Sequence, residues 1–192
     1  MESAPRVLVI GIGNILMMDE GIGNRIATDL ERNYEFPADT SVMDAGTMGL
    51  GMIHLFRGVE LLVVADAIDG TGYPPGTVVR LSPADFAPNQ VMHSLHDIRF
   101  VDVLEAARLI EIEPEADCIG VQVENMSPAE LTIGLSAPVD AAVPRAIAAV
   151  LYVLEDHGVH VTPRPDGDTE LHAAVAEAKA DIERRQVDAG PE

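Results

Sequence analysis

Apolar residues in this chain form short, nearly continuous runs separated by glycine, proline and polar residues. The longest runs cover residues 6–12 and 60–67, and shorter ones cover 41–44, 77–81 and 117–123. A strand that is apolar at every position is buried on both faces, as strands of a parallel sheet are. These runs therefore predict about five strands, most of them parallel.

Helical spacing of apolar residues occurs between the predicted strands. Ile22, Ile26 and Leu30 recur at this spacing, and similar patterns cover residues 50–56, 98–109 and 138–156. Asp19 precedes the first pattern and is predicted to be its N-cap. The alternation of strands and helices predicts an α/β fold: a three-layer α/β/α sandwich around a twisted, mostly parallel sheet.

The composition changes after Thr162, where proline, glycine and charged residues dominate. We predict one α/β domain over residues 1–162 and a polar, mobile C-terminal tail over residues 163–192. A polar helix over residues 171–185 is the alternative for this tail. No internal repeat or second domain is visible in the sequence.

Three polar residues are predicted to lie at the carboxyl edge of the sheet. Glu20 begins the first helix, Asp66 ends the most apolar strand, and His96 lies in a loop beyond the predicted strand 77–81. Open α/β sheets place their sites at this edge, and two carboxylates with an imidazole can bind a divalent transition metal. A buried Asp66 would be costly or protonated unless a metal or a hydrogen-bond donor faced it.

Other polar residues are weaker candidates for the site. Asp44 and Asp69 are candidates for orienting His96 or holding a peptide, and His93 is a rival ligand that fits the spacing less well. His54 falls on a predicted helix and is expected to be structural. Cys118 lies within an apolar strand and is predicted to be a small core residue, not a nucleophile.

The glycines of residues 11–14 (Gly-Ile-Gly-Asn) suggest a dinucleotide-binding turn at first sight. The fingerprint requires a third Gly or Ala at the position that Leu16 occupies here, and acids at 19 and 20 would oppose a pyrophosphate. A tight strand exit with close backbone approach explains these glycines better.

Charge and cysteine content narrow the function further. A net charge of −20 argues against binding to nucleic acid or to an anionic membrane surface. One cysteine cannot form an internal disulfide, and the N-terminus has no signal-peptide pattern. No apolar run reaches the roughly 20 residues that cross a bilayer. We therefore expect a soluble, cytoplasmic protein.

Five segments resemble the nickel–iron hydrogenase maturation endopeptidases. Residues 11–23 (GIGNILMMDEGIG) resemble the family's opening motif, and residues 44–50 (DAGTMGL) resemble its D-G-G-T turn, with Ala45 replacing a glycine. Residues 64–69 resemble its D-A-I segment. Residues 94–97 resemble its S-x-H-Q segment, with Asp97 replacing glutamine, and Ile133 to Ser136 also resemble a family segment.

The resemblance implies an endopeptidase that removes a C-terminal extension from the precursor of a hydrogenase large subunit after nickel insertion. The family's metal-binding residues correspond to Glu20, Asp66 and His96, which would be both nickel ligands and catalytic residues. The nickel would arrive with the substrate, without a resident organic cofactor. A nickel-dependent checkpoint protein that binds the precursor without cutting it is the alternative.

Ordinary protease machinery is missing from the sequence. It contains no H-E-x-x-H pair for a resident zinc and no G-x-S-x-G nucleophile turn. Two further alternatives are a nucleotide-binding domain and a different hydrolase on a similar sandwich. If nickel binds a neutral His96, activity should fall below a pH of about 6.5.

Overall fold

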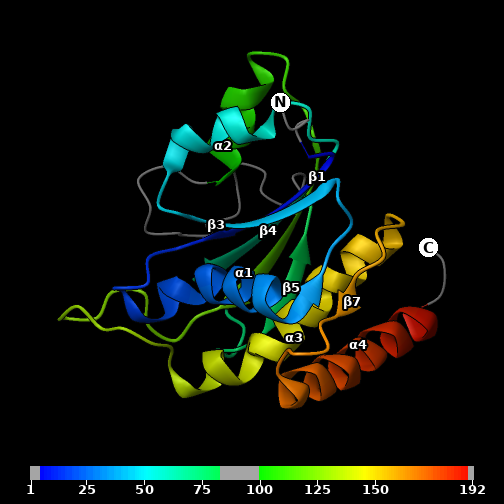
Figure 1. Ribbon diagram of the computed structural model, residues 1–192. Helices are drawn as coiled ribbons and strands as arrows, with labels where there is room; N and C mark the ends of the chain where they lie inside the picture. Colours follow the sequence, from blue (N-terminus) through cyan, green and yellow to red (C-terminus); the bar gives the residue numbers. More distant parts are fainter. Residues whose placement is uncertain (1–4, 83–99, 190–192) are drawn as a thin grey trace.

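The computed structural model describes residues 5–82 and 100–189 and is built around a five-stranded sheet of order β3-β1-β4-β6-β5 (Figure 1). Four strands are parallel, and β5 runs antiparallel to β6 at the edge. The predicted α/β fold with a mostly parallel sheet of about five strands is confirmed. The strands are β1 (Val7–Ile12), β3 (Thr40–Gly46), β4 (Leu61–Ile68), β5 (Val78–Leu81) and β6 (Glu115–Gln122).

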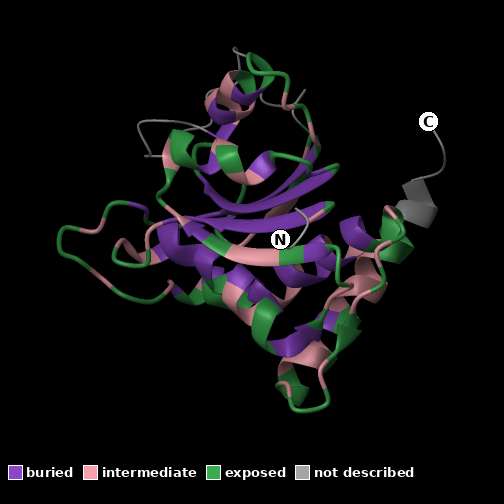
Figure 2. Cartoon of the chain, turned by 45° about the horizontal axis from the view of Figure 1, so that its top comes forward, coloured by how far each residue is buried: buried purple, intermediate pink, exposed green. Residues whose placement is uncertain are grey.

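Helices cover both faces of the sheet. Side chains alternate along β1, so that Val7 and Val9 pack toward α1 (Ile22–Asn33) and α3 (Ala137–Asp156). Leu8 and Ile10 pack on the opposite face, which is covered by η2 (Gly49–Phe56) and α2 (Phe100–Arg108). Strands buried on both faces form the middle layer in Figure 2. This double burial explains why β1 and β4 are apolar at nearly every position.

Among the described residues, one helix is long and apolar enough to cross a membrane by length and composition alone. This helix is α3, with 20 residues, and 56% of its most apolar window is buried inside the protein. Core helices pass the same test, so its composition is weak support for a membrane span. Here α3 packs against the sheet, which accounts for its apolar residues.

The C-terminal segment differs from the predicted mobile tail. Residues Thr162–Pro163 form β7, which pairs with β2 (Tyr34–Glu35), and Thr169–Ala189 form the helix α4, which packs along α3. An apolar stripe joins α4 to the core, with Val175 buried. The stripe has helical spacing and consists of Leu171, Val175, Ala178 and Ile182.

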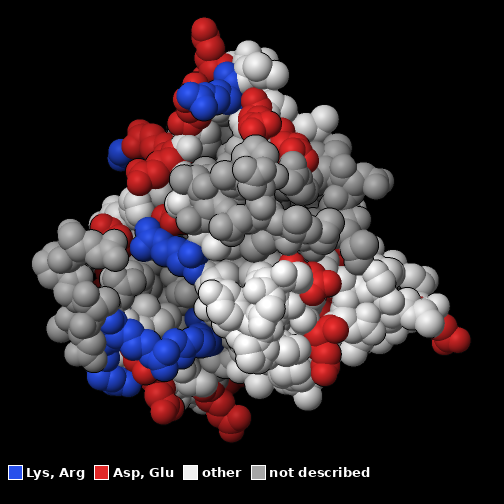
Figure 3. Space-filling model, turned by 180° about the vertical axis from the view of Figure 1, so that it is seen from behind, with Lys and Arg blue, Asp and Glu red and all other residues white. Residues whose placement is uncertain are grey.

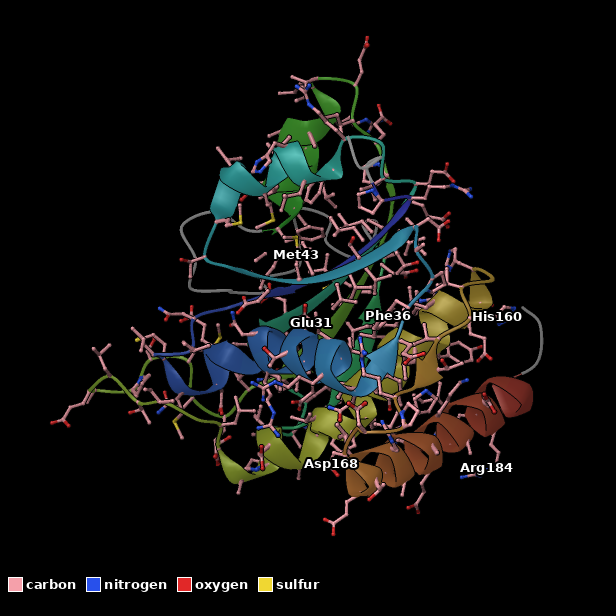
Figure 4. The ribbon with its side chains drawn as sticks, viewed as in Figure 1. Glu31, Phe36, Met43, His160, Asp168 and Arg184 are labelled. Carbon is pink, nitrogen blue, oxygen red and sulfur yellow. The ribbon has the colours of Figure 1, made fainter. Side chains whose placement is uncertain are left out.

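Polar contacts also hold α4 in place. Asp168, labelled at the start of α4 in Figure 4, donates its backbone N–H to Asn33 Oδ1 over 2.7 Å. Arg145 on α3 donates to Asp181 on α4 over 2.8 Å. The alternative of a polar helix therefore describes this segment correctly. The domain boundary at residue 162 stays a prediction.

Candidate functional site

The candidate site lies where successive strands of the chain are placed on opposite sides of β1. After β1 the chain passes through α1 to β3 on one side of β1, and then crosses to β4 on the other side. The carboxyl ends of β1 and β4 therefore flank a topological switch point, which is where open α/β sheets bind ligands.

Glycines allow α1 to start very close to these strand ends. A Cβ atom on Gly23 would lie 2.1 Å from the Ile12 carbonyl oxygen and 2.4 Å from that of Ala65. A Cβ atom on Gly11 would lie 2.0 Å from the Gly23 oxygen. The predicted close backbone approach is therefore confirmed. It brings the segment that contains Glu20 against the end of β4.

Glu20 and Asp66 come together at this point. Glu20 lies in a 3-10 helix, η1 (Met18–Gly21), directly before α1, and Asp66 lies in β4. Both side chains are buried, with exposed fractions of 4% and 8%. Two carboxylates from separate elements thus share one nearly dry corner of the sheet edge.

The environment of Asp66 favours its protonated form. Burial is the main reason that the pKa of Asp66 rises to about 7, and the charge of Glu20 acts in the same direction. The Ala67 N–H, which donates to Asp66 Oδ1 over 2.8 Å, acts against this rise in pKa. Such a pair of acids fits a divalent cation, because positive charge would offset both the burial and the repulsion.

His96, the third predicted ligand, lies outside the described residues, as do His93 and Asp97. Within residues 5–82 and 100–189, no group of three His, Cys, Asp or Glu side chains has a geometry that could hold a metal ion. The structure thus brings two of the three predicted residues together, and their binding of metal stays a prediction.

Asp44 and Asp69 brace turns beside this corner. Asp44 Oδ1 accepts the Gly46 N–H over 2.8 Å and also accepts a hydrogen bond from the side chain of Asn24 on α1. Asp69 Oδ1 accepts the Gly70 N–H over 2.7 Å. These contacts fix the loops after β3 and β4, and the predicted contacts with His96 or a peptide stay predictions.

Asp19 is not the N-cap that the sequence predicts. Gly21 occupies the N-cap position of α1, and Asp19 is fully buried. Its carboxylate accepts four hydrogen bonds from the segment between β6 and α3. The donors are Ser136 N (2.6 Å), Ser136 Oγ (2.9 Å), Asn125 N (2.9 Å) and Glu124 N (3.0 Å).

Sequence reasoning missed the hydrogen bonds between Asp19 and Ser136, although both residues lie in segments that resemble the family. Ser136 ends one of the segments that carry the family resemblance, and Asp19 lies in another. The rules for helix ends consider only neighbouring residues, whereas Asp19 and Ser136 are separated by 117 positions in the chain.

Cys118 agrees with its predicted role as a core residue, and the predicted structural role of His54 stays a prediction. Cys118 is buried in β6, and burial raises the pKa of its thiol well above the usual value, with Asp66 and Asp117 adding to the rise. A thiol kept protonated in this way is a poor nucleophile. His54 is exposed on η2, in the layer opposite α1 and α3.

Comparison with known proteins agrees with this arrangement. A model of the family described as hydrogenase maturation protease matches residues 24–153. The hydrogenase 2 maturation protease of Escherichia coli K12 is 37% identical over 164 residues, spanning 83% of this chain and 96% of that protein. The hydrogenase expression/formation protein HupD of Rhizobium leguminosarum is 38% identical over 168 residues, spanning 85% and 81%.

The chain belongs to the hydrogenase maturation protease family. Solved structures of the family have the same fold. The hydrogenase maturating endopeptidase HybD of E. coli superposes with a TM-score of 0.74 and 36% identity, covering 84% of this chain and 99% of that one. The [NiFe] hydrogenase maturation protease HybD of Thermococcus kodakarensis superposes with a TM-score of 0.62 and 25% identity, covering 77% and 98%.

Membership confirms the family predicted from the motifs and identifies this chain as a member of a family of hydrolases. The family match ends at residue 153, before β7 and α4. The match includes Asp66 and begins four residues after Glu20.

Proposed function

We propose that this protein is a cytoplasmic endopeptidase that removes the C-terminal extension of a nickel–iron hydrogenase large-subunit precursor. Cleavage would follow nickel insertion, and the substrate's nickel would serve for recognition. The observation that supports this proposal most is the pair of buried carboxylates, Glu20 and Asp66, at the switch point. The family membership supplies the class of substrate.

The proposed chemistry requires a nickel ion on the precursor with room for further ligands. Glu20, Asp66 and His96 would complete the coordination of the bound nickel and so fix the scissile peptide bond beside it. A metal ion in this position polarises a carbonyl oxygen or lowers the pKa of a bound water. A carboxylate beside the metal would accept the proton of an attacking water.

The decisive measurement is intact-mass spectrometry of the precursor after incubation with this protein. We expect loss of a C-terminal peptide from the nickel-loaded precursor and not from the nickel-free one. Cleavage of both forms would refute the nickel requirement. Stable binding to the nickel-loaded form without any cleavage would support the checkpoint alternative.

A substitution separates metal binding from folding. Glu20→Gln removes one charge and should lower the affinity for the nickel-loaded precursor at least tenfold, while the domain stays folded. Glu31→Gln is the matched control, because Glu31 is an exposed residue of α1, labelled in Figure 4. Equal affinity of Glu20→Gln and Glu31→Gln for the nickel-loaded precursor would exclude Glu20 as a ligand.

A further inference from the structure

Most of the large apolar side chains exposed by the described residues follow the carboxyl ends of strands. They stand in the segments that follow β1, β3, β4 and β6, including the first turn of η2, on the same side as Glu20 and Asp66. Two others, Leu109 and Ile110, precede β6 and lie near the amino ends of the strands. The carboxyl-edge set is Ile15, Leu16, Met48, Leu50, Tyr73, Leu131 and Ile133.

Three of these residues are held close together by a parallel bridge between Met17 and Thr132. Met18 N–H donates to the Thr132 carbonyl over 2.7 Å, and Thr132 N–H donates to the Leu16 carbonyl over 2.9 Å. These hydrogen bonds place Leu131 and Ile133, the neighbours of Thr132, beside Leu16. We refer to Leu16, Leu131 and Ile133 as the apolar rim.

The apolar rim is strongly exposed, since Leu131 and Ile133 have exposed fractions of 74% and 78%. Exposed loops usually carry polar side chains, and apolar side chains gathered in one place mark an interaction site. The loop that bears them projects from the body of the molecule beside the segment before α1 (Figure 1).

The backbone beneath the rim is held firmly. Asp19 accepts hydrogen bonds from both ends of the loop, at Glu124 and Asn125 and at Ser136. The bridge at Thr132 fixes its middle. A surface that is already in its bound form loses little conformational entropy when a partner binds, so these contacts favour docking.

The rim is continuous with the candidate site. Leu16 and Glu20 belong to one short segment, which Asn14 N–H closes by donating to the Glu20 carbonyl over 3.3 Å. A substrate chain held at Glu20 and Asp66 therefore lies beside the rim. The lobe that this loop forms in Figure 3 is mostly uncharged, with Asp or Glu at its tip and no Lys or Arg in view, so an apolar partner surface fits it better than an acidic one.

We propose that the apolar rim docks an apolar surface of the hydrogenase large-subunit precursor next to the bond that is cut. This inference rests on the proposed function and adds a binding surface to it. The rim would hold the precursor while Glu20 and Asp66 meet the metal. It would therefore contribute to substrate affinity and not to the chemical step.

The test compares two double variants, each of which replaces one exposed Leu and one exposed Ile. Leu131→Ser with Ile133→Ser alters the rim, and Leu109→Ser with Ile110→Ser is the matched control near the opposite edge of the sheet. Steady-state cleavage of the nickel-loaded precursor gives KM and kcat, and titration calorimetry with the same precursor gives Kd. Thermal unfolding and sedimentation report fold and oligomeric state.

We expect the rim variant to raise KM and Kd about tenfold with kcat unchanged, because uniform binding is lost. The control variant should match the wild type. Equal KM and Kd values in all three proteins would refute the proposal that the rim binds the precursor. A change in the oligomeric state of the rim variant alone would also refute it. If the wild type cleaves nothing, the proposed function fails, and the Kd values still decide whether the rim binds the precursor.

Discussion

Replacing Asp19 by Asn tests whether this carboxylate anchors the loop between β6 and α3. Asn keeps the size of the side chain but presents one carbonyl oxygen and one NH₂ group. Asp19 accepts Ser136 N–H on Oδ1 and three further hydrogen bonds on Oδ2. Whichever way the amide turns, at least one buried N–H group faces another donor.

The expected cost follows from these four bonds. A buried donor without a partner costs about 1–3 kcal/mol, and bonds to a neutral acceptor are about 1 kcal/mol weaker than bonds to a charged one. The lower desolvation cost of a neutral amide offsets part of this loss. We therefore expect Asp19→Asn to lower the free energy of unfolding by about 3 kcal/mol.

Urea denaturation measures this change, with an unchanged m-value showing that the folded state is equally compact. Asp140→Asn is the control, because Asp140 is exposed and its ion pair with Arg25 should contribute less than about 1 kcal/mol. An N-cap tolerates Asn as well as Asp. A loss below about 0.5 kcal/mol for Asp19→Asn, as expected of an N-cap, would refute the anchoring role.

Three further results are expected. Gly23→Ala should destabilise the protein by about 3 kcal/mol in urea unfolding, because the added Cβ would meet backbone oxygens. Gly51→Ala is the control, since its Cβ would meet nothing within 4 Å, and it should change stability by less than about 0.5 kcal/mol. Equal losses of stability in the two variants would contradict the close approach of Gly23 to the ends of β1 and β4. The hydrogen bond from His157 Nδ1 to the Val153 carbonyl raises the pKa of His157, so its contribution to stability is complete below a pH of about 6.5 and is lost as pH rises through the raised pKa. The difference in urea midpoint between wild type and His157→Gln should therefore shrink from pH 5.5 to pH 9, and a constant difference would exclude this linkage. Cys118 should react with a thiol reagent only at the rate of unfolding, whereas fast labelling of the native protein would show that the thiol is accessible.

Features that depend on local patterns could be predicted from the sequence. The strands β1 and β4 were found because burial on both faces leaves an unbroken apolar run, and α3 was found from its long aliphatic pattern. The pairing of Glu20 with Asp66 followed from the rule that parallel strands end at one edge of the sheet.

Features that depend on distant partners could not be predicted in this way. The antiparallel direction of β5 is set by its pairing with β6, and the run of residues 77–81 contains no sign of it. Asp19 was misread because its donors lie more than 100 positions away. The apolar stripe on α4 has helical spacing, but it is narrow, and the many polar residues around it favoured the prediction of a tail. The placement of His96 lies outside the described residues.

The C-terminal helix has a consequence for how the chain completes its fold during synthesis. Asn33, at the end of α1, accepts hydrogen bonds from the backbone of Arg164 and Asp168. The end of the first helix therefore gains these partners only after the residues of every strand in the five-stranded sheet and of α3 have been synthesised. A chain truncated before residue 164 would contain Glu20, Asp66 and these strands, but it would lack α4. The surface of α3 that packs along α4 would then be exposed to water.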